Sequence, residues 1–213
     1  MSKTNQNFTD SMGNPVLASL YSFIGHTEIK RLMNQIYTSQ RASFFKTVAV
    51  LSESAGEGKS FFTAALALAY SNMMRSKVLV INTVPDSPVG DLLLKSVVGV
   101  HSEANGTDKI ARVDLITARN DVNKQQALGS DFQLTNYIDR FSRGYNIVFI
   151  DTCALTKANN CMIDPIIVAK NVDTSILVVS PKSLGHASMR NMVGKLKRYG
   201  ITPLGAVYNT GVS

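Results

Sequence analysis

The stretch that decides the fold is Thr47-Val-Ala-Val-Leu-Ser-Glu-Ser-Ala-Gly-Glu-Gly-Lys-Ser60, in which an apolar run leads into a glycine-containing loop that ends in Lys-Ser. The apolar run predicts a buried strand, and the apolar residues after Ser60 predict a helix. Glycines let backbone N–H groups converge on phosphate oxygens, the following helix N-terminus adds positive potential, and the lysine reaches the terminal phosphates. The stretch therefore predicts a phosphate-binding loop between a strand and a helix.

The residues of this loop are the first candidates for a nucleotide site. Lys59 is a predicted catalytic residue because it carries charge to the phosphates, and the Ser60 hydroxyl is a predicted Mg2+ ligand. Glu53 departs from the general pattern, which has a glycine at that position. The alternative is a glycine-rich turn that ends in lysine by chance, but the flanking strand and helix argue against it. The predicted nucleotide-binding residues here are Ala55, Gly56, Glu57, Gly58, Lys59, Ser60 and Phe61.

A second motif lies downstream, where the apolar residues 147–150 are followed directly by Asp151. A carboxylate at the end of a buried strand beside a phosphate loop is the arrangement that holds Mg2+ and its waters. We therefore predict that Ser60 and Asp151 hold the metal and that Asp151 is the second catalytic residue. The alternative is an aspartate that only begins the turn after the strand.

Apolar segments of strand length alternate with longer helical segments from about residue 47 to the end of the chain. This alternation is typical of parallel strands joined by crossover helices, so we predict an α/β fold with a doubly wound, mainly parallel sheet flanked by helices. The predicted strands are 47–51, 77–81, 113–117, 145–150, 174–179 and 204–208. The predicted helices are 60–74, 132–141, 162–171 and 186–199, and the segment 91–98 also fits a short helix.

Length and composition fit one domain with a short extension. The chain has 213 residues, of which 45% are hydrophobic and 17% charged, so it contains enough apolar material for a buried core. We predict a flexible tail over residues 1–19 and a nucleotide-binding domain over residues 20–213, with a first helix at about 27–37. No apolar run approaches the roughly 20 residues of a membrane span, so we expect a cytoplasmic protein. The net charge of +7 permits nucleic acid, anionic lipid or a phosphorylated ligand as a partner.

Four segments resemble, in order and spacing, the bacterial tyrosine kinases, the cytoplasmic P-loop family that regulates exopolysaccharide and capsule synthesis. They are residues 47–60, 78–81, 145–152 and 203–209, and the resemblance covers about residues 20–209. More distantly, the chain resembles the partition and division-site ATPases. The resemblance implies ATP or ADP with Mg2+, a homo-oligomer, a peripheral location at the inner membrane and an inner-membrane polysaccharide co-polymerase as partner. It also implies that Asn209 contacts the adenine, although asparagine at a strand end is equally typical of a turn.

One departure from the family's pattern concerns assembly. The kinases carry an E-x-x-R-x-x-R strip that packs against the nucleotide site of a neighbouring subunit. The corresponding residues here are Glu28, Arg31 and Asn34, so two of the three positions match. Glu28 and Arg31 are therefore the predicted oligomer interface, and an ordinary solvated helix face is the alternative.

Two further departures concern catalysis. The family has a strand ending in D-x-D, but the equivalent strand here ends in Asn82-Thr-Val, and a neutral amide cannot take the proton of a phenol. Asp86 lies two residues too far along the chain to be a clean substitute. The family's terminal cluster of tyrosines is also missing, because the seven tyrosines are dispersed. These differences predict a degenerate or weakly active kinase, or a regulatory subunit.

Two alternatives remain open. The first is a partition or positioning ATPase that binds DNA or anionic membrane through a basic helix face formed by Arg190, Lys195, Lys197 and Arg198. A second lysine early in the phosphate loop and a terminal amphipathic helix would support it, and the sequence has neither. Nucleic acid is thus the less favoured partner. The second alternative is a non-catalytic scaffold that holds nucleotide only to stay folded.

Overall fold

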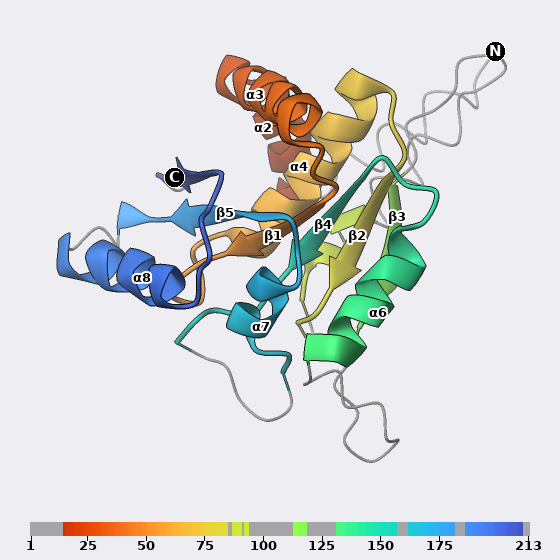
Figure 1. Cartoon of the computed structure of the whole chain (residues 1–213). Helices are drawn as coiled ribbons and strands as arrows, with labels where there is room; N and C mark the ends of the chain where they lie inside the picture. Colours follow the sequence, from red (N-terminus) through yellow and green to blue (C-terminus); the bar gives the residue numbers. More distant parts are fainter. Residues whose placement is uncertain are drawn as a thin grey trace, which may run out of the picture.

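A six-stranded sheet forms the centre of the molecule (Figure 1). The computed structural model describes residues 15–84, 87–90, 92–93, 113–118, 131–156, 162–181 and 186–210. The strand order is β3-β2-β4-β1-β5-β6, and every neighbouring pair is parallel. The carboxyl ends of β1, β2 and β4 therefore meet at one edge of the sheet. The strands are β1 Thr47–Leu51, β2 Val78–Asn82, β3 Val113–Thr117, β4 Ile147–Asp151, β5 Thr174–Val179 and β6 Gly205–Tyr208.

Helices cover both faces of this sheet. Figure 1 shows α2, α3 and α4 on one face and α6, α7 and α8 on the other. The helices are α2 Pro15–Gly25, α3 Thr27–Ser43, α4 Lys59–Met74, α6 Asp131–Ser142, α7 Pro165–Lys170 and α8 His186–Arg198. The predicted doubly wound α/β fold is confirmed.

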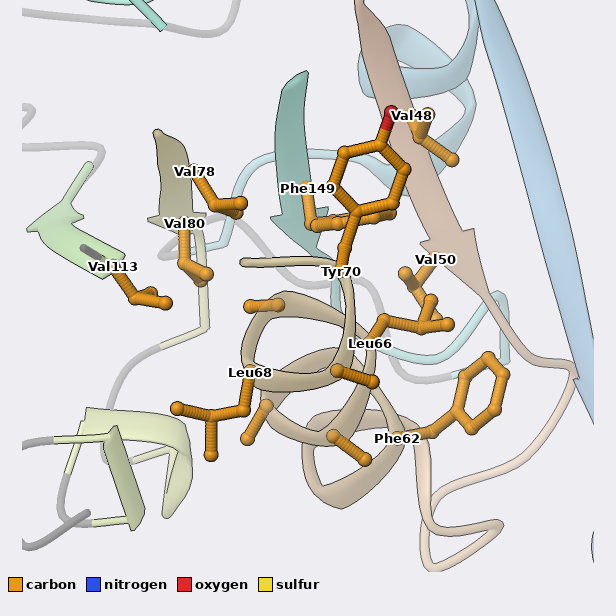
Figure 2. Packing of buried hydrophobic residues seen from close by; sticks show 14 of the residues in the cluster. Val48, Val50, Phe62, Leu66, Leu68, Tyr70, Val78, Val80, Val113 and Phe149 are labelled. Carbon is orange, nitrogen blue, oxygen red and sulfur yellow. The ribbon is translucent and has the colours of Figure 1, made fainter. Parts of the chain in front are cut away.

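Successive side chains along a strand point to opposite faces of the sheet and so pack into two separate hydrophobic cores. In β1, Val48 and Val50 belong to the core on the α4 side, whereas Leu51 belongs to the core on the α7 and α8 side. Figure 2 shows the first of these cores, in which Tyr70 of α4 lies against Phe149 of β4 with ring centroids 6.2 Å apart. Because both faces of the sheet are covered, all five residues of β1 are buried, which explains the unbroken apolar run in the sequence.

Two helices differ in length from their predictions. The helix expected over 162–171 occupies only Pro165–Lys170, because Asp164 caps it: its side chain accepts a hydrogen bond from the Ile166 N–H at 2.8 Å. Proline at the first helical position is well suited to that start. The helix expected at 27–37 is longer and continues to Ser43, where Phe44 adopts a left-handed conformation with φ of 55° and ends it.

The tail predicted over residues 1–19 extends too far, because α2 begins at Pro15. This helix forms because its apolar residues pack on α4: Leu20 is fully buried, and Phe23 and Ile24 lie against the same core. Residues 1–14 and most of the segment 91–98 lie outside the described residues, but Leu92 and Leu93 are helical and buried. No helix in the described parts of the chain is long and apolar enough to cross a membrane.

Candidate nucleotide-binding site

The predicted phosphate loop lies between the end of β1 and the start of α4, at residues 52–58. Two glycines give it its shape, because Gly56 and Gly58 have φ angles of +80° and +84° that other residues adopt only with strain. A Cβ atom at Gly58 would lie 2.4 Å from Asn209 Nδ2, so a side chain at this position would displace the Asn209 amide from the loop. The loop thus presents its backbone and the first turn of α4 at the carboxyl edge of the sheet, which is the arrangement that binds phosphate.

Lys59 is the first residue of α4, and it is largely enclosed, with 9% of its surface exposed. Burial lowers the pKa of its ammonium group below the ordinary value of 10.5, and the charges of Asp151, Cys153 and Glu57 oppose that shift. The side chain therefore lies near the carboxyl groups of Asp151 and Glu57, with little water around it. A cation in such a place interacts strongly with an anionic ligand, because the surroundings screen it weakly.

Ser60, Ser87 and Asp151 form a compact polar cluster next to the loop. The Ser60 hydroxyl donates to Asp151 Oδ2 at 2.7 Å, and the Ser87 hydroxyl lies 2.8 Å from the same oxygen. The two serine oxygens are 3.1 Å apart. The structure thus brings the predicted metal residues Ser60 and Asp151 into direct contact and adds Ser87, which the sequence analysis did not identify.

Asp151 is completely buried at the end of β4, and its environment fits a cation. Burial raises the pKa of its carboxyl group above the ordinary value, while the hydrogen bond from Ser60 and the charge of Lys59 oppose the rise. Its Oδ1 atom has no hydrogen-bond partner within the part of the chain that the structure describes. A buried carboxylate oxygen without a partner is costly unless a ligand or an ion satisfies it.

The donor set suits Mg2+ bound together with a nucleotide. The described residues contain no group of three His, Cys, Asp or Glu side chains that could hold a metal by themselves. Mg2+, however, prefers oxygen ligands and is usually held by one or two carboxylates, several waters and the phosphates of its substrate. Asp151 Oδ1 and the neighbouring hydroxyl groups fit that chemistry, so Asp151 and Ser60 are the residues that would hold the metal.

Glu57 turns its side chain into the phosphate loop. It is 3% exposed, and its Oε2 atom accepts a hydrogen bond from the Ser54 N–H at 3.0 Å. Its Oε1 atom is buried and has no partner among the described residues. Glu57 is a predicted nucleotide-binding residue, and its carboxylate stabilises the loop through the Ser54 N–H. Its backbone carbonyl accepts a hydrogen bond from Asn209 Nδ2 at 3.0 Å.

The remaining predicted ligand residues fall into three places. Ala55 and Gly56 are exposed at the tip of the loop. Asn209 follows β6 and reaches the loop through the hydrogen bond just described, so this residue is brought to the site from the far end of the sequence. Phe61 lies in the first turn of α4, but its ring packs edge-on against Phe23 of α2 with centroids 5.5 Å apart. Its side chain therefore contacts α2.

The position of the family's D-x-D motif carries no carboxylate. Asn82 is 5% exposed, and its Oδ1 atom accepts a hydrogen bond from the Val84 N–H at 2.9 Å. The Thr83 hydroxyl donates to the backbone carbonyl of Asp151 at 2.7 Å. Both side chains thus stabilise the turn after β2, and Asp86 lies outside the described residues.

The predicted interface residues lie on α3, outside the phosphate loop and the strand ends. Glu28, Arg31 and Asn34 are exposed on α3, whose opposite side is buried through Ile29 and Met33. The strip is therefore accessible from solvent in the single chain, as a contact surface for another molecule would be.

A parallel sheet of this strand order, with a glycine-rich loop after β1 and a buried aspartate at the end of the neighbouring β4, defines the P-loop NTPase fold. Solved structures with the same fold include the kinase domain of the Escherichia coli tyrosine kinase ETK. That domain has a TM-score of 0.65 and 19% identity, with 87% of this chain and 75% of that chain covered. The kinase domain of VpsO has a TM-score of 0.59 and 20% identity, with 97% of each chain covered.

A third similar structure is the septum site-determining protein MinD from Pyrococcus horikoshii OT3, complexed with Mg-ADP. Its TM-score is 0.52 at 18% identity, and 76% of this chain and 69% of that chain are covered. No protein-family model matches the sequence, and no curated protein matches it. At these identities the likeness concerns the fold, which is the one that the sequence resemblance to bacterial tyrosine kinases and division-site ATPases implied.

Proposed function

We propose that the protein binds ATP and ADP together with Mg2+ through the loop at residues 52–58 and the first turn of α4. The observation that carries this proposal is the hydrogen bond between Ser60 and Asp151, because it places a hydroxyl and a buried carboxylate with a free oxygen beside the loop. Lys59 neutralises phosphate charge, and backbone N–H groups of the loop and helix hold the phosphate oxygens. Bound Mg2+ would supply further charge neutralisation at the phosphates.

Phosphoryl transfer to tyrosine is expected to be very slow or undetectable in the isolated protein. The reaction depends on positioning, on the metal and on a group that can take the phenolic proton. Asn82 has a neutral amide whose oxygen is already engaged by the Val84 N–H, so it cannot serve as that base. We therefore propose a degenerate or weakly active relative of the tyrosine kinases rather than a competent kinase.

The proposed cellular role is regulation of polysaccharide polymerisation or export, with an inner-membrane co-polymerase as partner. This part rests on the sequence resemblance and on the kinase domains that share the fold. Assembly into a homo-oligomer would use the exposed strip with Glu28 and Arg31 on α3. The chain would then act at the cytoplasmic side of the membrane through its partner.

A second candidate function is a positioning ATPase that binds DNA or anionic membrane. The observation in its favour is that Arg190, Lys195, Lys197 and Arg198 of α8 are all exposed. Such a surface attracts polyanions, and the attraction weakens as salt is added. Co-sedimentation with phosphatidylglycerol-containing vesicles and a DNA mobility assay, each at two salt concentrations, would test this candidate.

The main proposal is tested by isothermal titration of the protein with ATP and ADP, each with Mg2+ and with EDTA. We expect both nucleotides to bind and Mg2+ to strengthen the binding. Mass spectrometry of the same samples should detect little or no phosphotyrosine. Lack of binding under all four conditions would refute the nucleotide site, whereas abundant phosphotyrosine would return the protein to the active kinases.

A further inference from the structure

Ser87 reaches the candidate metal site from a part of the chain outside the two nucleotide-binding motifs of the sequence. It follows the turn after β2, and its half-buried hydroxyl lies 2.8 Å from Asp151 Oδ2 and 3.1 Å from Ser60 Oγ. Three segments that are far apart in the sequence therefore meet at one carboxylate. Neither the phosphate-loop motif nor the motif ending in Asp151 includes Ser87.

The position of Ser87 is fixed from its other side as well. Its oxygen accepts a hydrogen bond from the Val89 N–H at 3.3 Å, as a residue does at the start of a helical turn. The Leu92 N–H then donates to the Pro88 carbonyl at 3.0 Å. Val89 and Leu93 are 0% and 2% exposed and belong to the core beside α4. The packed turn thus holds the Ser87 hydroxyl at the carboxylate.

Among the described residues, no second carboxylate is hydrogen-bonded to Ser60, Ser87 or Asp151. Asp151 Oδ2 is occupied by the two serine hydroxyls, and Oδ1 is left without a partner among the described residues. Asn82, which pairs with Asp151 across β2 and β4, uses its amide oxygen in its own turn. With a single carboxylate, the orientation of that group decides how well the metal is held. A hydroxyl that fixes a ligating carboxylate is commonly worth about tenfold or more in metal affinity.

We infer that Ser87 is a positioning residue for the Mg2+ that accompanies the nucleotide. Its hydroxyl fixes Asp151 through Oδ2, leaves Oδ1 directed to the metal, and adds an oxygen group beside that of Ser60. It compensates in part for the carboxylates that positions 82 and 84 lack. This inference rests on the proposed function, since it concerns Mg2+ bound with ATP or ADP.

The test compares the Kd of ATP with Mg2+ to the Kd of ATP with EDTA in the full chain; their ratio is the Mg2+ enhancement. Ser87→Ala should reduce the enhancement about tenfold and leave the Kd in EDTA unchanged. Ser87→Thr keeps the hydroxyl and should retain the parental enhancement. Ser76→Ala is the matched control, because Ser76 is also half-buried and its hydroxyl donates to a backbone carbonyl, that of Met74, at 3.0 Å.

Ser87→Gly is a second variant without the hydroxyl, and it should fold because glycine is well tolerated at a helix start. The same loss of enhancement in both variants supports the inference. An enhancement within twofold of the parent in either folded variant, or an equal loss in Ser87→Thr, would overturn it. If the parent protein binds no nucleotide at all, the proposed function fails together with this inference. If the parent binds nucleotide and the Ser87 variants keep the parental Mg2+ enhancement, the inference alone fails.

Discussion

Two aspartates lie beside the central strand β1, Asp173 near its amino end and Asp151 near its carboxyl end. Their surroundings differ. Asp173 precedes β5 and is exposed; its Oδ2 atom accepts hydrogen bonds from the N–H groups of Lys46 and Thr47 at 2.7 and 2.8 Å and from the Thr47 hydroxyl at 2.8 Å. Asp151 ends β4 and is buried, and its Oδ2 atom is bonded to the hydroxyl groups of Ser60 and Ser87.

The difference separates a structural role from a binding role. Backbone N–H groups cannot rotate away, so the carboxylate of Asp173 is committed to fixing the start of β1. Hydroxyl groups can redirect their protons, and Asp151 Oδ1 has no partner among the described residues, so this carboxylate can exchange its contacts for a cation. The backbone N–H groups at the amino end of β1 therefore stabilise the fold. The hydroxyl groups at its carboxyl end leave Asp151 able to bind a ligand.

The largest effect should come from removing the cation at the carboxyl end of β1. Lys59→Met keeps the aliphatic stem and should weaken ATP binding about 100-fold, because two charge-assisted hydrogen bonds at roughly 1.5 kcal/mol each are lost. Titration calorimetry measures this directly. Lys77→Met is the control: this lysine is exposed and directly precedes β2, so the variant should bind ATP like the parent. ATP binding of parental strength in Lys59→Met would contradict the assignment of the ligand site to the carboxyl end of β1.

A smaller and conditional effect is expected for Asp151→Asn. It should weaken ATP binding about tenfold with Mg2+ present and leave it unchanged in EDTA, because the carboxylate acts through the metal. Asp173→Asn serves as the control at the amino end of β1 and should change neither value. Equal losses with and without Mg2+ in Asp151→Asn would make Asp151 a structural residue like Asp173.

The same variant has a consequence for the pH dependence of stability. Because burial raises the pKa of Asp151, the folded protein binds this proton more tightly than the unfolded chain does. The contribution of Asp151 to the free energy of unfolding therefore falls as the pH rises from the ordinary value of 3.8 through the raised pKa. Asp151→Asn should lack that fall when unfolding is followed in urea without nucleotide.

The smallest effect should appear at the amino end of β1, and in stability alone. Asp173→Ala should lower the free energy of unfolding by about 1–2 kcal/mol, because two backbone N–H groups and a hydroxyl lose their acceptor. The ATP affinity and its Mg2+ enhancement should stay at parental values. Asp139→Ala, at an exposed aspartate on α6, is the control for urea unfolding. A change in Mg2+ enhancement in Asp173→Ala would contradict the purely structural role of Asp173.

Local patterns predicted the elements and one pair of site residues. The unbroken apolar run of β1 and the glycines after it depend on neighbours in sequence, and the order of strands and helices implied that Ser60 and Asp151 would meet at one edge. The limits of α7 could also have been read from Asp164 and Pro165, since an acidic residue before a proline is a common helix start.

Other features depend on tertiary structure and were not predicted from the sequence. Ser87 was missed because its contact with Asp151 depends on the path of the chain after β2, although Ser-Pro is itself a helix-start signal that marked its position. The inward turn of Glu57 was missed because its partner, the Ser54 N–H, becomes available only in the folded loop. Burial of α2 was missed because it depends on the apolar surface that α4 offers.

The placement of β1 between β4 and β5 also bears on how the chain folds. Ser60 and Asp151 are 91 positions apart, and the pairing of Thr47 with Val148 spans a similar separation. Bringing such distant segments together costs loop-closure entropy before any contact compensates for it, so the pairing of β1 with β4 belongs among the slower events of folding. The cluster around Asp151 cannot exist before that event. A nucleotide that needs the cluster would bind the finished domain but no earlier intermediate, and would retard unfolding without hastening folding.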